Sequence, residues 1–199
     1  EHQLSPQVLA RWKADLIENL PEEHIVVSTT GMASRELFEL REARGESHAA
    51  DLLTVGSMGH TSHIALGIAL AHPETPVFCF DGDGSAIMHM GGLPTIAAEA
   101  RENYKHIMLN NGAHDSVGGQ PTLGRQIDLV GIALACGYKG ARTARTEEEL
   151  EGSLAWLKRE RGPLFLEIVI RKGARPDLGR PTASPMENRD ALMERIGSR

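Results

Sequence analysis

The feature that most constrains this sequence is a regular alternation of short apolar runs with longer segments of helical periodicity. The apolar runs are too short for helices and are rich in β-branched or aromatic residues, which is typical of buried strands. Strands that alternate with helices, with no tight hairpin signal between them, predict one parallel sheet with helices on both faces. The predicted strands are 25–27, 52–55, 77–80, 107–109, 141–144 and 164–170, and the predicted helices are 5–20, 34–44, 60–71, 92–102, 127–136 and one starting at 146–149.

The pattern predicts an α/β fold, a three-layer doubly wound parallel sheet, as a single domain over residues 1–199. A change in composition marks residues 173–199 as a C-terminal tail with a short polar helix near its end. A chain of 199 residues can bury a sizeable core without disulfides or structural metals. Because aromatic residues make up only 4% of it, small aliphatic residues must fill that core.

Charge and apolar patterning exclude several classes of protein. The formal charge is −6 and the arginines are spread along the chain, so a nucleic-acid-binding surface is not expected. No apolar run approaches the roughly 20 residues that a membrane span needs, and the first residues show no basic-then-apolar leader. Cys79 and Cys136 form neither a zinc spacing nor a disulfide framework, which suits a reducing cytoplasm.

Polar and glycine-rich clusters follow four of the predicted strands, namely 29–31, 56–59, 82–85 and 110–112. The carboxyl ends of parallel strands meet at one edge of a sheet, where ligands bind. Glycines allow close approach of the backbone, and helix N-termini offer N–H groups to phosphate oxygens. The four clusters therefore predict one site for a phosphorylated ligand.

Two of these clusters have the oxygen ligands that Mg²⁺ prefers. Asp83 and Asn110 are 27 residues apart, about the length of one strand–helix–strand unit. Asp83 offers a carboxylate oxygen, Asn111 an amide oxygen and Ala113 a backbone carbonyl, which leaves three octahedral positions for a diphosphate and a water. A dinucleotide fingerprint fails because Ile87 stands where its third glycine is required, and no P-loop sequence is present.

The Gly82-Asp83-Gly84 and Asn110-Asn111 pair resembles the metal motif of thiamine diphosphate enzymes and implies their fold, with thiamine diphosphate and Mg²⁺ as cofactors. Residues 56–59 resemble the segment ahead of that motif, which implies that Met58 wedges under the thiazolium ring. Periodicity alone favours Met58 as a core residue, and an ordinary turn remains the alternative for residues 82–84. The implied cofactor-binding residues are Thr30, Gly31, Gly56, Ser57, Met58, Gly82, Asp83, Gly84, Ser85, Asn111 and Ala113, with Thr30 and Ser85 as diphosphate donors or helix caps.

A narrower resemblance to the phosphonopyruvate decarboxylases covers residues 28–38, 54–60, 88–91, 109–122, 173–175, 177–182 and 187–188. It implies the conversion of 3-phosphonopyruvate to phosphonoacetaldehyde and CO₂. The β subunits of sulfopyruvate decarboxylases look similar, and they tend to differ at residues 110–114. In this family a pyrimidine-binding domain or α subunit supplies an activating glutamate, and the segment before residue 25 is too short to be that domain. The resemblance therefore implies a partner and a higher oligomer, with a non-catalytic cofactor-binding subunit as the alternative.

Histidines and arginines near the predicted site are the candidates for substrate chemistry. His114, just past the metal-binding loop, is the first candidate for acid–base catalysis, and His60 is the second. His63 is expected to be a packing or interface residue, and His89 to support the metal site indirectly. Arg35, Arg175 and Arg180 could contact a phosphonate, or Arg35 could pair with an acid on its own helix and the other two could be solvated.

Overall fold

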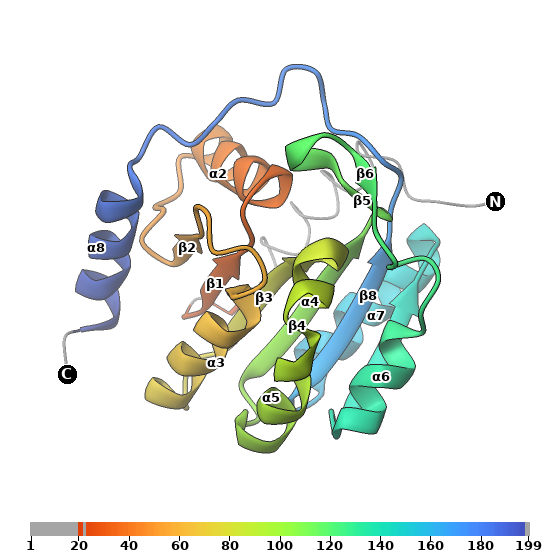
Figure 1. Ribbon diagram of the computed structural model, residues 1–199. Helices are drawn as coiled ribbons and strands as arrows, with labels where there is room; N and C mark the ends of the chain where they lie inside the picture. The colour runs from red at the N-terminus through yellow and green to blue at the C-terminus, as the bar shows by residue number, and fades with distance from the viewer. Residues whose placement is uncertain (1–19, 22, 198–199) are drawn as a thin grey trace.

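The computed structural model describes residues 20, 21 and 23–197. The strands form one six-stranded parallel sheet in the order β2-β1-β3-β4-β8-β7 (Figure 1). Their bounds are Ile25–Ser28 for β1, Asp51–Leu53 for β2, Val77–Gly82 for β3, Tyr104–Asn110 for β4, Gly140–Ala144 for β7 and Leu164–Val169 for β8. All six predicted strands are present, and the predicted parallel arrangement is confirmed.

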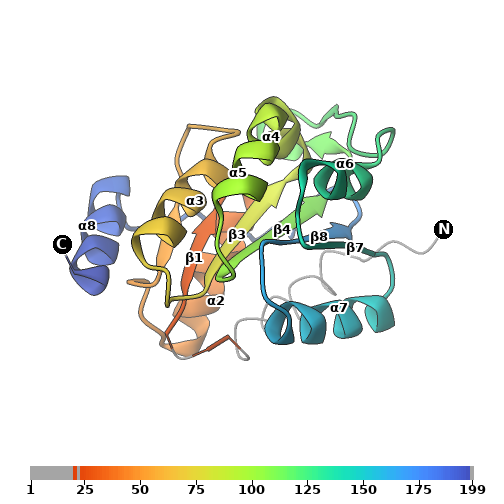
Figure 2. The same ribbon diagram turned by 90° about the horizontal axis from the view of Figure 1, so that it is seen from below.

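Helices cover both faces of the sheet, which gives the predicted three layers (Figure 2). On one face lie α3 (Thr61–Ala71), α4 (Asp83–Met88), α5 (Leu93–Glu99) and α6 (Leu129–Cys136). On the other face lie α2 (Met32–Arg44) and α7 (Glu147–Arg159). Each layer boundary has its own apolar core, one around Phe78 and Leu157 and the other around Ile96 and Phe165. The helix predicted over 5–20 lies outside the described residues, except for Leu20.

The sheet reverses its winding direction between β1 and β3. The connection from β1 to β2 runs through α2 on one face, and the connection from β2 to β3 returns through α3 on the other. Right-handed crossovers require this change of face when the winding reverses. The reversal opens a crevice beyond the carboxyl ends of β1 and β3, which is where such sheets bind ligands.

Several short elements were not predicted. Ala113–His114 (β5) and Gln120–Pro121 (β6) pair as a small antiparallel hairpin outside the six predicted strands, with a 3₁₀ turn at Asp115–Val117. Helix α4 begins within the glycine-rich cluster after β3, and a 3₁₀ turn at Met90–Gly92 joins it to α5. The hairpin folds over the carboxyl ends of the strands.

The segment predicted as a tail crosses the top of the sheet and ends in α8 (Pro185–Ile196), beside the edge strand β2 (Figure 1). The Asn188 side chain accepts the Leu53 N–H at 2.8 Å and donates to the Asp51 carbonyl at 2.8 Å. It thereby satisfies backbone groups that an edge strand otherwise leaves unpaired. In the part of the chain that the structure describes, no helix combines the length and the apolar character needed to cross a bilayer.

Lys105 on β4 is expected to make stability rise at alkaline pH. Its side chain is only 6% exposed and donates to the Glu160 carbonyl, and burial lowers its pKa to about 8. Between pH 8 and pH 10.5 the unfolded chain holds a proton that the folded chain has lost, so the unfolding free energy increases with pH. We expect this increase to be about 1–3 kcal/mol.

Urea unfolding from pH 7 to pH 10 of the wild type and of Lys105→Met measures this contribution. The difference in unfolding free energy between the two proteins should shrink as pH rises. The wild type loses the cost of burying a charged ammonium group, and Lys105→Met never has that cost. Lys172→Met, at an exposed lysine that donates to the Gly119 carbonyl, is the matched control and should leave the pH profile unchanged. Parallel profiles for the wild type and Lys105→Met would contradict the prediction.

Candidate functional site

A cavity opens at the crevice between β1 and β3, beyond the carboxyl ends of four strands. Its walls come from the segments that follow β1, β3, β4 and β8, together with Met58 from the segment after β2. The predicted site residues in its lining are Thr30, Met58, Gly82, Asp83, Gly84, Ser85, Asn111, Ala113 and His114. The structure thus brings segments far apart in the sequence to one place.

Asp83 is the central charged group of this cavity. It begins α4, directly after β3, and is only 2% exposed. Its carboxylate accepts hydrogen bonds from the Thr122 hydroxyl and from the N–H groups of Gly84 and Asn111. Burial raises the pKa of Asp83, and these donors limit the rise. No cationic side chain pairs with it among the described residues, so its charge is balanced by hydrogen bonds alone.

The two asparagines after β4 have different surroundings. Asn110 is fully buried and donates to Glu167 and to the Gly124 carbonyl, both at 2.6 Å. Asn111 lines the cavity, where its amide nitrogen donates to Asp115 at 2.8 Å. Its amide oxygen accepts the Ala113 N–H at 3.0 Å. The Asp115 contact fixes which end of the amide is the oxygen, so Asn111 presents the atom a cation needs.

The residues around Asp83 fit a divalent cation that bridges to an anionic ligand. Asp83, Asn111 and Ala113 line the same cavity and offer carboxylate, amide and carbonyl oxygens, the donor types that suit Mg²⁺. Glu36, Asp81 and Asp115 also line it, against a single arginine, Arg171. Because four carboxyl groups repel a diphosphate, such a ligand needs a cation between it and the protein.

Ser85 joins three of the strand-end segments. It is 1% exposed, and its hydroxyl oxygen accepts hydrogen bonds from the Thr29 hydroxyl at 3.2 Å and from the Gly59 N–H at 3.1 Å. Its own hydroxyl proton has no acceptor among the described residues, and the residue lines the cavity. Ser85 can therefore donate to an anion there, whereas Thr30 lies half-buried at the rim.

Met58 lies between this cavity and a second hollow beside it. The predicted residues Gly31, Gly56 and Ser57 line only the second hollow. Gly56 and Ser57 have φ of 68° and 47°, and Ser57 is the one non-glycine residue with positive φ in the described chain. Among the residues that the structure describes, no backbone hydrogen bond involves the Gly56 carbonyl or the Met58 N–H. Both groups are therefore available to a ligand.

The two candidate catalytic histidines lie in different places. His114, on β5, lines the cavity and packs against Gly84 so closely that a Cβ there would lie 2.4 Å from its ring. His60 lies outside both hollows, with its ring centroid 4.3 Å from that of His89 and 6.4 Å from that of His63. The geometry favours His114 over His60 as the group that meets a ligand.

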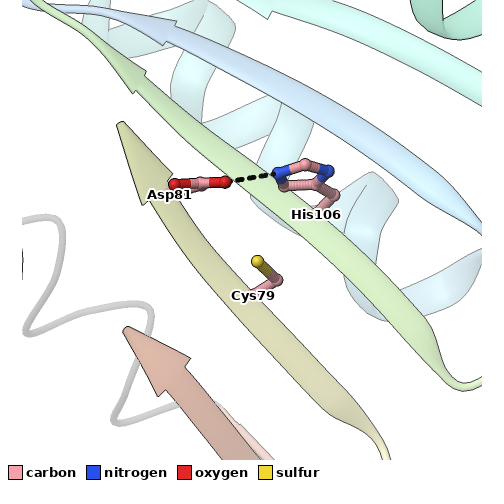
Figure 3. Close-up of side chains that lie close together, drawn as sticks. All are labelled: Cys79, Asp81 and His106. Atoms are coloured by element: carbon pink, nitrogen blue, oxygen red, sulfur yellow. Dashed lines mark ion pairs between the residues drawn. The ribbon is translucent and has the colours of Figure 1, made fainter. Parts of the chain in front are cut away.

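A second group of metal-ligating side chains lies on β3 and β4, and one member of it, Asp81, also lines the cavity (Figure 3). Cys79 and Asp81 on β3 and His106 on β4 are fully buried, with ligand atoms within 4.8 Å of one another. Asp81 Oδ2 lies 3.6 Å from His106 Nε2, and His106 Nδ1 lies 3.2 Å from the Tyr138 hydroxyl. One carboxylate beside a thiol and an imidazole does not suit Mg²⁺, which prefers oxygen ligands and retains waters. This group therefore differs from the site around Asp83.

The structure adds residues that the sequence reasoning missed. Thr122 and Asp115 orient Asp83 and Asn111, and both come from the hairpin region. Gly124 packs so tightly that a Cβ would lie 2.5 Å from Asp83 Oδ2 and 2.8 Å from Asn110 Oδ1. The sequence signal for Asp115 and Thr122 was the family resemblance of residues 109–122, and Gly124 lies outside that run.

Comparison with known proteins identifies the family of the chain. Residues 29–168 match the family model described as thiamine pyrophosphate enzyme, C-terminal TPP binding domain, and thiamine pyrophosphate is thiamine diphosphate under another name. A solved structure of the thiamine diphosphate-dependent 4-hydroxybenzoylformate decarboxylase of Rhodococcus jostii RHA1 superposes with a TM-score of 0.66 at 20% identity, covering 88% of this chain and 34% of the other. At that identity the likeness shows the fold alone.

Curated relatives are closer in sequence. The phosphonopyruvate decarboxylase of Streptomyces viridochromogenes is 41% identical over 172 residues, which cover 86% of this chain and 42% of the relative. The sulfopyruvate decarboxylase subunit beta of Methanocaldococcus jannaschii is 37% identical over 134 residues, which cover 67% of this chain and 68% of the subunit. The chain thus spans less than half of the Streptomyces relative and about two thirds of the archaeal subunit.

Proposed function

Because this chain belongs to the thiamine pyrophosphate enzymes through their C-terminal TPP binding domain, we propose that it holds the cofactor of a decarboxylase acting on 3-phosphonopyruvate. The products are phosphonoacetaldehyde and CO₂. The observation that carries the proposal is the convergence of Asp83, Asn111, Ser85 and His114 in one cavity of a chain 41% identical to a phosphonopyruvate decarboxylase. Because Cys79 and Cys136 form no disulfide, we expect the protein to work in a reducing cytoplasm.

The cofactor is thiamine diphosphate with Mg²⁺, and when bound it supplies a carbon nucleophile and an electron sink for the loss of CO₂. Asp83, Asn111 and the Ala113 carbonyl hold the metal ion. Ser85 and Thr30 donate to diphosphate oxygens, while Gly31, Gly82 and Gly84 let the backbone approach them. Met58 supports the ring system, with the neighbouring Gly56 and Ser57 presenting backbone groups to it.

His114 is our candidate for the donor of the proton that the reaction consumes. The carbon that loses CO₂ must gain a proton before the aldehyde can leave. His114 lines the cavity beside Gly84, so it is placed to hold that proton at an imidazole nitrogen. His60 remains a second candidate that would require a ligand or partner to reach it, because it lies outside the cavity.

We also propose that a pyrimidine-binding domain or α subunit completes the site with the activating glutamate, in a higher oligomer. The match to the Methanocaldococcus subunit beta, over 68% of its length, favours a separate subunit. The same match makes sulfopyruvate decarboxylation the second candidate function. A non-catalytic subunit that binds the cofactor without turnover is the third.

Reconstitution tests these alternatives. The chain is combined with its pyrimidine-binding partner, thiamine diphosphate and Mg²⁺, and CO₂ release is measured from phosphonopyruvate, sulfopyruvate and pyruvate. We expect kcat/KM for phosphonopyruvate to exceed that for the other two. Faster release from sulfopyruvate would favour the second candidate, and bound cofactor with no release from any of the three would favour the non-catalytic subunit.

A further inference from the structure

The second hollow lies beside the cofactor cavity and shares Thr30, Met58 and Ser116 with it. Its walls come from the start of α2, from the segment after β2 and from the C-terminal crossing segment, 171–184. Two of its lining residues are arginines, Arg35 on α2 and Arg180 on the crossing segment. No aspartate or glutamate is among the described residues that line it. The hollow is therefore positively charged next to a cavity lined by four carboxyl groups.

The side chains of both arginines lack partners among the described residues. Arg35 is half-buried, and neither its side chain nor that of Arg180 forms an ion pair or hydrogen bond with any of the residues that the structure describes. Arg175, on the same crossing segment, differs because it pairs with Glu39 at 2.5 Å and lies 3.4 Å from Asp177. A half-buried guanidinium without an acidic partner has hydrogen-bond donors left for a ligand.

Glu39 fixes the crossing segment in the position that brings Arg180 to the hollow. One oxygen of its carboxylate pairs with Arg175, and the other accepts the Gly179 N–H at 2.6 Å. Arg180 follows directly and lines the hollow opposite α2. The strained Gly56–Ser57 turn lies in the same wall, and such backbone strain concentrates at ligand sites.

We propose that Arg35 and Arg180 bind the tetrahedral oxyanion, phosphonate or sulfonate, carried by the carbon next to the 2-oxo acid group of the substrate. The inference rests on the proposed function and extends it to the residues that recognise the substrate. A substrate with its 2-oxo group at the cofactor has only one methylene before the oxyanion, and the two hollows adjoin at Met58 and Thr30. Arginine suits this role because its planar fork binds oxyanions through two parallel hydrogen bonds.

Steady-state kinetics of the complete assembly give the first test, with Arg35→Gln, Arg180→Gln and the matched control Arg189→Gln, at an exposed arginine of α8. We expect each of the first two changes to raise KM for phosphonopyruvate by about 10- to 100-fold. KM for pyruvate, which has no oxyanion head group, should stay the same. Comparison with sulfopyruvate shows whether the pair prefers phosphonate or sulfonate.

Binding gives a second readout that does not need turnover. Methylphosphonate and methanesulfonate are titrated into the assembly by calorimetry, and we expect weaker binding in Arg35→Gln and Arg180→Gln than in Arg189→Gln. Unchanged KM values and unchanged binding of both probes would overturn the inference, even where phosphonopyruvate is decarboxylated. If no 2-oxo acid is turned over but binding still depends on the two arginines, the proposed function fails and the anion site stands.

Discussion

Replacement of Asp83 by asparagine is expected to weaken the binding of thiamine diphosphate by about 100-fold or more at saturating Mg²⁺. The change removes the charge from the one carboxylate in the proposed metal ligand set. Loss of residues that merely orient metal ligands already costs about 10- to 100-fold in affinity, so loss of a ligand should cost at least as much. Calorimetric titration of the cofactor into the assembly measures this directly.

The same replacement should stabilise the chain when no cofactor is bound. Burial holds the pKa of Asp83 above its ordinary value, so the charged carboxylate costs folding free energy. That cost appears as pH rises through the folded pKa. We therefore expect Asp83→Asn to raise the unfolding free energy of the cofactor-free chain at pH 7 by roughly 1 kcal/mol, a typical single-site effect.

Opposite signs for the two measurements separate a metal ligand from a structural carboxylate. Asp190→Asn, at an exposed acid on α8, is the charge-matched control and should change neither quantity. A cofactor affinity that is unchanged in Asp83→Asn would contradict the metal site. A loss of affinity together with a loss of stability would instead indicate that Asp83 mainly holds the fold together.

The fold was predictable because its strands carry their own signal. β3, β4 and β8 are buried along almost their whole length, and each contains an apolar run of three or more residues, as expected for strands covered on both faces. The structure extends β4 by three residues before the predicted start, through Tyr104, Lys105 and His106. Lys105 and His106 are polar residues in a buried strand, and nothing local in the sequence distinguishes them from a loop.

The site was predictable only in part, because its supporting contacts are long-range. The Thr122 hydroxyl reaches Asp83 across 39 residues, and Asn188 reaches Leu53 across 135. Neither pairing follows from spacing or periodicity. Helix α4 has six residues and starts inside a glycine cluster, so it reads as a loop. The choice between Arg175 and Arg180 likewise required Glu39, which lies on a different element.

A buried ion pair that holds β2 in place carries the largest expected effect on stability. Arg41 of α2 is 5% exposed and Asp51 of β2 is fully buried. The guanidinium binds the Asp51 carboxylate through two hydrogen bonds of 2.9 Å, and it also donates to Glu46 at 2.7 Å. Its Nη2 lies 3.0 Å from His24 Nε2. The pair joins α2 to the edge strand that leads into Gly56 and Met58.

Replacement of Arg41 by methionine should lower the unfolding free energy by about 3–5 kcal/mol, because it leaves the Asp51 charge buried without a cation. Asp51→Leu should cost less, because the Arg41 guanidinium keeps its ion pair with Glu46 at 2.7 Å. The double replacement should recover much of the loss, because well-packed apolar residues can substitute for a buried ion pair. Urea unfolding of the four proteins gives the double-mutant cycle.

The exposed pair Arg189–Asp190 on α8 is the matched control, and Arg189→Met should cost less than about 1 kcal/mol. The cycle also bears on function, because β2 positions the wall that the two hollows share. If Arg41→Met weakens cofactor binding and the double replacement restores it, the ion pair contributes to the site by holding β2 in position. If the losses of unfolding free energy in the two single variants add up in the double variant, each side chain acts separately. The prediction that Arg41 and Asp51 act as an ion pair would then be wrong.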